Sequence, residues 1–110
     1  MEHHPLAGLM ATAAAPGERY HEFLRQPSMS IGLYVLPAGG VDGQSPHTED
    51  EAYVVLAGRS RFTAGDEMRD VTPGDTIFVP AGVPHRFHDI TEELRLIVVF
   101  APPEGSLAPG

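Results

Sequence analysis

Short apolar runs that end at glycine or proline are the feature that most constrains how this chain folds. The chain holds 12 Gly and 11 Pro among 110 residues, a content that approaches the range of disordered sequences. From residue 19 onward, however, these residues separate short apolar runs, as turns separate strands. No stretch after residue 18 repeats with a helical period, so we predict an all-β fold, closed as a sandwich or barrel. The predicted strands are 19–24, 29–36, 52–57, 59–64, 67–71, 76–79, 85–88 and 94–100.

The length of the chain favours one domain. We predict an N-terminal arm over 1–18, a β-barrel domain over 19–100 and a flexible, Pro- and Gly-rich C-terminal tail over 101–110. The apolar stretch 6–15 resembles the core of a secretion signal, but no Lys or Arg precedes it. We therefore expect a cytoplasmic protein. No apolar run approaches the roughly 20 residues that span a membrane, so we expect no membrane partner.

The composition excludes several kinds of chemistry. The chain has no Cys, which excludes disulfides, thiolate metal ligands and a thiol nucleophile. It has no Lys, which excludes Schiff-base chemistry. The formal net charge is −8, whereas a nucleic-acid partner requires a basic surface. The expected partner is therefore a small molecule.

Two segments place a histidine at the boundary between a turn and a strand. His47 precedes the strand predicted from residue 52, and His85 begins the strand predicted over 85–88. Glu51 has the same strand parity as His47, so an extended chain presents both on one face. Two imidazoles and one carboxylate form a ligand set for a divalent first-row metal that leaves up to three positions open. His47, Glu51 and His85 are therefore the predicted metal ligands, and a hydrogen-bonded polar cluster is the alternative.

These segments resemble the two motifs of the cupin superfamily, in the arrangement of germin-like and small bacterial cupins. His47-x3-Glu51-x6-Gly58 matches the end of the first motif, and Gly74-x5-Pro80-x-Gly82-x2-His85 matches most of the second. The 15 residues between Gly58 and Gly74 suit the short spacing of compact cupins. The resemblance covers residues 33–100 and implies a single-domain double-stranded β-helix, also called a jelly-roll barrel.

The chain departs from the family pattern at two positions. Ser45 stands where the first motif has another histidine, and Asp89 replaces the usual asparagine of the second motif. The resemblance implies three His and one Glu as ligands, so this site lacks one imidazole. Gln44 is a possible fourth ligand, and water is the alternative. The expected cofactor is one divalent ion, Fe, Mn, Ni or Zn.

Other residues are candidates for the wall of the cavity. Tyr53, Phe78 and Phe87 are aromatic candidates, with ordinary core packing as the alternative for each. Arg61 either faces inward, where it would bind a substrate carboxylate, or lies in solvent. Because sheet edges need cover, we also expect a homodimer in which the strand at 20–24 takes part.

Four acidic or imidazole side chains near the motifs carry further expectations. Glu49 and Asp50 are expected in a solvated acidic turn, with Glu49 as an alternative ligand. His88 has the opposite parity to His85 and is expected on the other face. Asp89 shares parity with His85 and either orients that imidazole or is a turn residue.

The resemblance supports the fold and the metal better than the reaction. The first functional expectation is a non-haem-iron, dioxygenase-like enzyme acting on a small organic molecule. The alternatives are a non-enzymatic ligand-binding or sensing module with weak or no metal, and a metal-dependent isomerase or lyase.

Overall fold

The computed structural model describes residues 1–11, 19–43 and 46–107. Within these residues the chain forms one short helix and six strands. The elements are α1 (Leu6–Ala11), β1 (Tyr20–Gln26), β2 (Met29–Leu36), β3 (Asp50–Ala64), β4 (Glu67–Val71), β5 (Thr76–Val79) and β6 (His85–Ala101). The all-β fold class is confirmed, and β2, β4 and β5 have the predicted bounds.

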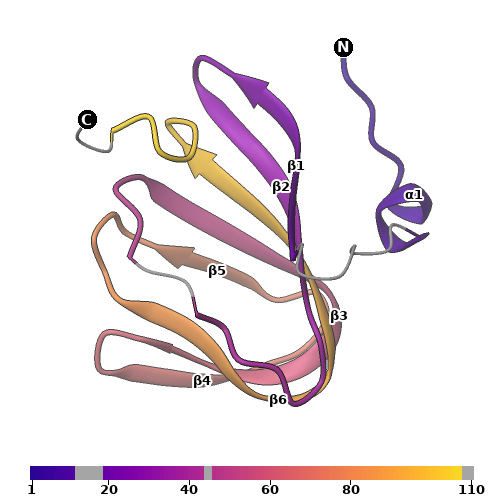
Figure 1. Cartoon of the computed structure of the whole chain (residues 1–110), viewed down its shortest axis with the longest axis vertical. Coiled ribbons are helices and arrows are strands. Elements are labelled where there is room, and N and C mark those ends of the chain that lie inside the picture. The colour runs from indigo at the N-terminus through magenta and orange to yellow at the C-terminus, as the bar shows by residue number, and fades with distance from the viewer. Residues whose placement is uncertain (12–18, 44–45, 108–110) are drawn as a thin grey trace.

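The strands pair in the order β1-β2-β6-β3-β4, and β5 pairs with β3 beside this path. Every pairing is antiparallel. The long strands β3 and β6 pair along most of their length and bend together, and β5 pairs with the first part of β3 and β4 with its last part (Figure 1). This winding is that of a jelly roll, as predicted.

Each long strand changes its inward face partway along. In β3, residues 51, 53 and 55 are buried, but beyond Gly58 the buried positions are 60 and 62. The pairing of β3 with β6 shifts register between Val55 and Arg61. Gly58 has φ +100, and a Cβ there would lie 2.7 Å from Leu94 Cα, so only glycine fits this bend.

Strand β6 changes face at Asp89. Its buried residues are 85 and 87 before this position and 90, 94, 96, 98 and 100 after it. Asp89 has φ 49, a conformation that aspartate tolerates better than most residues. We predicted two strands in the region of β3 and two in the region of β6, and the structure has one bent strand in each. The reason is that Gly58 and Asp89 bend these strands without ending them.

The inward faces form one hydrophobic core between the sheet layers. Its largest fully buried apolar side chains include Tyr53, Phe87 and Phe100. The rings of Tyr53 and Phe87 lie 5.0 Å apart and nearly perpendicular, a favourable geometry for aromatic pairs. The core therefore adjoins the residues of the predicted metal site, since Tyr53 is two residues from Glu51.

The two ends of the described chain lie against the barrel. Helix α1 lies outside it (Figure 1), where Arg95 donates to Leu9 O at 3.3 Å. After β6, the backbone N–H of Glu104 donates to Ser30 Oγ at 2.9 Å. The described part of the segment predicted as a free tail is thus attached to the barrel. Its Pro and Gly content did not reveal this, because the attachment depends on partners distant in sequence.

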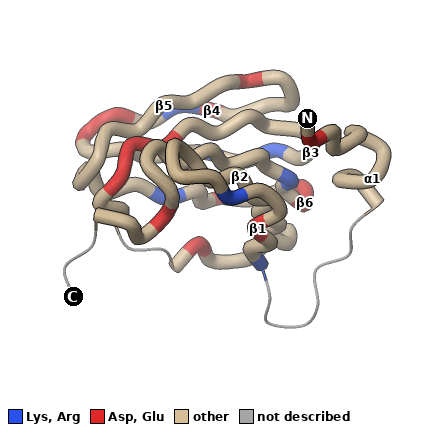
Figure 2. Tube along the Cα trace, turned by 90° about the horizontal axis from the view of Figure 1, so that it is seen from above, with Lys and Arg blue, Asp and Glu red and all other residues tan. Residues whose placement is uncertain are grey.

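Charged residues are distributed over the strands and loops, with acidic positions more numerous than arginines (Figure 2). No helix of the described residues is long and apolar enough to cross a membrane.

Candidate metal centre

The three predicted ligands meet at one end of the barrel. His47 lies in the loop before β3, Glu51 is the second residue of β3, and His85 is the first residue of β6. Their candidate ligand atoms all lie within 4.8 Å of one another. The structure therefore brings together His47, Glu51 and His85 as a possible metal-binding group.

Hydrogen bonds from two backbone N–H groups hold the two motif segments together. Gly82 N–H donates to His47 O at 2.8 Å, and Ala81 N–H donates to Asp50 Oδ1 at 2.8 Å. These bonds join the loop that carries His47 to the turn that leads into His85. The Pro80-Ala81-Gly82 turn therefore positions a histidine, although its own side chains carry no ligand atom.

Burial is deepest at Glu51 and His85, which are 2% and 7% exposed. Glu51 Oε1 lies 2.5 Å from His85 Nε2 and 4.0 Å from His47 Nε2. The imidazole of His47 is partly exposed. The group is thus closed on the side of the core and open beside His47.

The hydrogen bonds of His85 fix which ring nitrogen carries a proton. Its Nδ1 lies 2.8 Å from Val83 O, and a carbonyl only accepts, so Nδ1 must be the N–H donor. In a neutral ring Nε2 is then a lone-pair atom, and it faces a carboxylate oxygen of Glu51. Two electron-pair donors this close require a cation between them, either a proton or a metal ion.

The pKa of His85 reflects this competition. Burial acts to lower it, but the hydrogen bonds to Glu51 and Val83 O and the charge of Glu51 raise it above its usual value. The Glu51 carboxylate therefore favours positive charge at His85 Nε2.

The donor set fits a divalent metal. Ligand atoms about 2.1 Å from a metal and at right angles to it lie about 3 Å apart. The observed separations of 2.5 and 4.0 Å from Glu51 Oε1 lie on either side of that value. Among the described residues no hydrogen-bond donor reaches Glu51 Oε2, although this atom is buried. A buried carboxylate oxygen without a partner is costly, and a bound cation would remove that cost.

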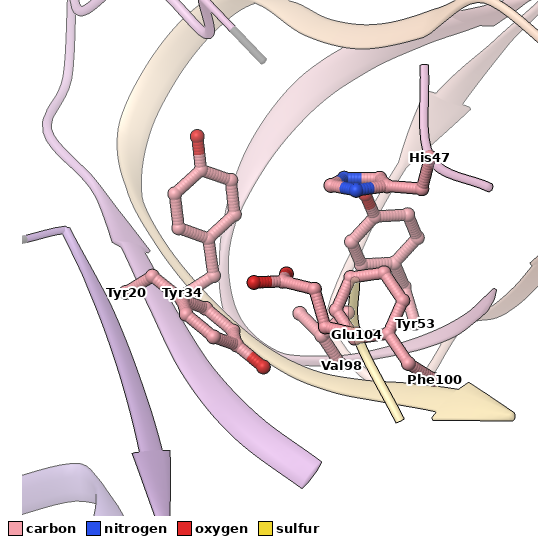
Figure 3. A pocket seen from close by; sticks show the side chains of 7 residues that line it. All are labelled: Tyr20, Tyr34, His47, Tyr53, Val98, Phe100 and Glu104. Atoms are coloured by element: carbon pink, nitrogen blue, oxygen red, sulfur yellow. The ribbon is translucent and has the colours of Figure 1, made fainter. Parts of the chain in front are cut away.

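A cavity of about 180 Å³ opens beside the group. Its wall is mainly aromatic, and His47 and Tyr53 join it to the metal ligands (Figure 3). Tyr53 Oη lies 3.1 Å from His85 Nε2, and since that nitrogen carries no proton in the neutral ring, the phenol donates. The lining residues are Tyr20, Tyr34, His47, Tyr53, Val98, Phe100 and Glu104.

The predicted wall residues have different locations. Tyr53 lines the cavity, whereas Phe87 is buried in the core next to it. Phe78 is 62% exposed, so the inward position predicted for it is wrong. It neighbours the inward Val79 on β5 and therefore faces the opposite side of the sheet. Arg61 faces outward beside Asp70, at 3.5 Å, because the bend at Gly58 reverses the inward face of β3.

Two expectations about acidic side chains are corrected. Glu49 is not in a solvated turn: it is 1% exposed and accepts hydrogen bonds from Gly105 N–H at 2.7 Å and Leu107 N–H at 3.1 Å. Burial opposes its ionisation, but these bonds and one from the Thr48 hydroxyl lower its pKa. Its oxygens are therefore used by the C-terminal segment and not by a metal.

Asp89 does not orient His85. Its carboxylate lies 2.8 Å from His88 Nδ1, and His88 Nε2 lies 2.7 Å from Thr63 Oγ1. Asp89 is exposed because β6 changes face at this residue, so counting parity from His85 gave the wrong side. Gln44, the candidate fourth ligand, lies outside the described residues, as does Ser45.

Sequence reasoning missed several residues near the site. Glu104, Tyr20 and Tyr34 line the cavity but belong to segments expected as a tail or as strands with no role in the site. Asp42 accepts from Tyr34 Oη at 2.7 Å and from Phe87 N–H at 2.9 Å. A lone aspartate before a turn gives no sign of such partners, and no pattern in the sequence would have identified them.

Comparison with known proteins supplies the family. The profile described as Cupin domain matches residues 32–100. The protein SCO3923 of Streptomyces coelicolor, itself uncharacterised, is 51% identical over 96 residues, which cover 87% of this chain and 91% of that protein. The dimethylsulfoniopropionate lyase DddQ of Ruegeria pomeroyi is 39% identical over 61 residues, which cover 53% of this chain and 30% of DddQ.

Solved structures share the fold. TT1209 from Thermus thermophilus superposes with a TM-score of 0.74 at 29% identity, covering 94% of this chain and 99% of TT1209. The crystal structure of DddQ superposes with a TM-score of 0.69 at 24% identity, covering 91% of this chain and 54% of that one. At this identity the second likeness concerns the fold alone.

Proposed function

This chain belongs to the cupin family, and on that premise we propose that it is a metal-dependent enzyme acting on a small organic molecule. One divalent ion is held by His47, Glu51 and His85, and the molecule is bound in the adjoining aromatic cavity. The expected metal is Fe, Mn, Ni or Zn.

One observation carries the proposal: the buried contact between Glu51 Oε1 and His85 Nε2 at 2.5 Å. A carboxylate oxygen and an imidazole lone pair do not attract each other unless a cation is present. Glu51 Oε2 is buried without a hydrogen-bond donor among the described residues, and His47 lies on the side of the cavity. Such an arrangement is typical of ligands that surround a cation, whereas a purely structural cluster normally satisfies each buried oxygen.

The remaining residues of the site would bind and orient the molecule. Tyr34, Val98 and Phe100 give the cavity an apolar wall that excludes water. Tyr53 Oη, held beside His85 Nε2, is a group able to give a proton to, or take one from, a molecule in the cavity. When bound, a divalent ion supplies Lewis-acid polarisation of a substrate oxygen.

Lyase chemistry is the reaction class that we favour. It needs a residue that moves a proton and a polarised substrate oxygen, and Tyr53 and the three ligands supply these two parts. The partial match to DddQ, which is named as a lyase, supports the same class.

Oxygen-dependent oxidation is the second candidate. Two imidazoles and one carboxylate form the ligand set of non-haem Fe(II) oxygenases, and this chain offers that set in His47, Glu51 and His85. Consumption of O₂ during turnover would favour this candidate over the lyase.

Metal titration of chelator-treated protein tests the proposal. We expect saturable binding of one ion per chain by calorimetry, and a higher melting temperature with the ion present. Loss of outer-shell partners already weakens metal binding about 10–100-fold, so the ligand substitution Glu51→Gln should weaken it at least about 100-fold. His47→Ala should also lose the ion.

The matched control is Glu67→Gln, which removes one carboxylate from an exposed strand position and should bind metal as the wild type does. Absence of metal binding, or equal binding by Glu51→Gln, would contradict the proposal. Turnover is then followed by NMR on β-substituted carboxylates, including dimethylsulfoniopropionate, with an oxygen electrode in parallel. Metal binding without any turnover would leave a binding module in place of an enzyme.

The homodimer and the cytoplasmic location remain predictions. Light scattering across a range of protein concentrations tests the first, and a monomer at every concentration would refute it. Fractionation of cells tests the second.

A further inference from the structure

The wall of the cavity combines aromatic rings with a carboxylate. Three tyrosines and Phe100 supply the rings, and among the described lining residues Glu104 is the one acidic side chain and none is an arginine. The ring of Tyr20 lies 6.3 Å from that of Tyr34 at 72° and 6.4 Å from that of Phe100 at 80°. Rings at steep angles to one another enclose a space from several sides, and their negative faces attract a cation within about 6 Å.

Glu104 is fixed by its backbone. Its N–H donates to Ser30 Oγ at 2.9 Å, and Arg25 donates to its carbonyl oxygen at 3.2 Å. The next residue, Gly105, donates its N–H to the buried Glu49. In Figure 3 the Glu104 carboxylate points into the space between the two tyrosines, Tyr20 and Tyr34, and the group of His47, Tyr53 and Phe100.

This carboxylate has no ion pair or hydrogen bond among the described residues. Arg25, the nearby cation, pairs with Glu22 at 3.0 Å and touches only the backbone of Glu104. Glu104 also lies outside the group of ligand atoms that includes Glu51. Its charge in the cavity is therefore not balanced by the metal ligands or by an arginine.

The surroundings add negative potential. Burial, and then the charges of Glu22, Glu49 and Glu51, raise the pKa of Glu104, while His47 opposes them. An anionic group would be repelled here, whereas a cation would meet ring faces and an unpaired carboxylate.

We propose that the cavity is a subsite for an onium group, a quaternary ammonium or similar alkylated cation, enclosed by Tyr20, Tyr34 and Phe100 and paired with Glu104. An onium group has no N–H to satisfy, so ring faces and one carboxylate suffice, whereas a primary ammonium would need further acceptors. The inference rests on the proposed function in one respect: the other end of the substrate reaches the metal ligands beside His47. The substrate class is therefore a small molecule with a cationic head and an oxygen-bearing tail.

Binding of choline to the metal-free protein tests this subsite independently of catalysis. NMR titration should show saturable shifts at Glu104, Gly105 and Tyr20. The uncharged isostere 3,3-dimethyl-1-butanol has the same shape and should bind at least about tenfold more weakly, because it lacks the attraction to the rings and the carboxylate.

Two variants separate charge from packing. Glu104→Gln keeps the size of the side chain and should weaken choline binding about tenfold, without changing the weak binding of the isostere. Glu67→Gln, which removes the same charge from an exposed strand, should bind choline as the wild type does. Thermal melts establish that both variants are folded.

Equal affinity for choline and its isostere, or unchanged choline affinity in Glu104→Gln, would overturn the inference. Absence of choline binding in a protein that still binds one metal ion would overturn the onium subsite and leave the proposed function standing. If the protein bound choline but no metal ion, the proposed function would be overturned and the onium subsite would stand.

Discussion

Replacement of Gly58 by alanine should strongly destabilise the protein, because two separate penalties meet at this residue. Its φ of +100 lies in a region that residues with a Cβ rarely adopt, which costs about 1–3 kcal/mol. The added Cβ would lie 2.7 Å from Leu94 Cα and 2.8 Å from Glu93 C, and closer still to Glu93 O. These are backbone atoms of the paired strand, which cannot rotate away, so overpacking adds about 1–3 kcal/mol.

Gly74 provides a matched control. Its φ is +93, close to that of Gly58, but a Cβ there would meet nothing within 4 Å. Gly74→Ala therefore carries the conformational penalty alone. We expect Gly58→Ala to lose about 2–6 kcal/mol and Gly74→Ala about 1–3 kcal/mol of a total stability of about 5–15 kcal/mol.

Urea unfolding followed by circular dichroism measures both losses, with the slope of the transition as a check that the denatured state is unchanged. If Gly58→Ala did not fold at all while Gly74→Ala folded, Gly58→Ala would again be the more strongly destabilised variant, as expected. Equal losses in the two variants would refute the reasoning, because they would mean that the approach of β6 to Gly58 has no energetic effect.

Two further substitutions test the region around the metal ligands. Tyr53→Phe should tighten metal binding about two- to tenfold, as measured by calorimetry. The reason is that the ion no longer displaces a hydrogen bond of about 0.5–1.5 kcal/mol from His85 Nε2. Weaker binding by the variant would mean that the Tyr53 hydroxyl stabilises the bound ion. Glu49→Gln should lose about 1–3 kcal/mol in urea unfolding, because two backbone N–H groups lose a charged acceptor, and amide exchange at Gly105 and Leu107 should accelerate. Unchanged exchange there, with Glu67→Gln as the control, would show that Glu49 does not hold the C-terminal segment.

Much of the fold was predictable because local patterns dictate strands and turns. The bounds of β2, β4 and β5 followed from apolar runs that end at Gly or Pro. The bends in β3 and β6 were not predictable, because Gly58 and Asp89 look like strand ends when only neighbouring residues are considered. In the fold the strand residues around each of them pair with the partner strand, so the strand continues and its inward face changes.

The candidate ligands were also predictable, because their residue types and spacing are set within two short motifs. His47, Glu51 and His85 needed only the correct positions along two segments, and the structure brings them within 4.8 Å. The direction in which the side chains face was left open for Arg61 and Asp89 and predicted wrongly for Phe78, and one reason explains all three. Parity along a strand gives the relative facing of side chains, but the absolute direction depends on bends and on what packs against the strand.

The sequence by itself determined an all-β chain, the turns that carry the two motifs, and the three side chains able to hold a metal. Only the tertiary structure decided what surrounds them. Glu104 and Tyr20 come from opposite ends of the barrel sequence and meet in one cavity, and Glu49 is buried because the C-terminal segment folds over it. These contacts join residues separated by more than 50 positions. No local sequence pattern predicts them, because each contact depends on how the whole sheet closes.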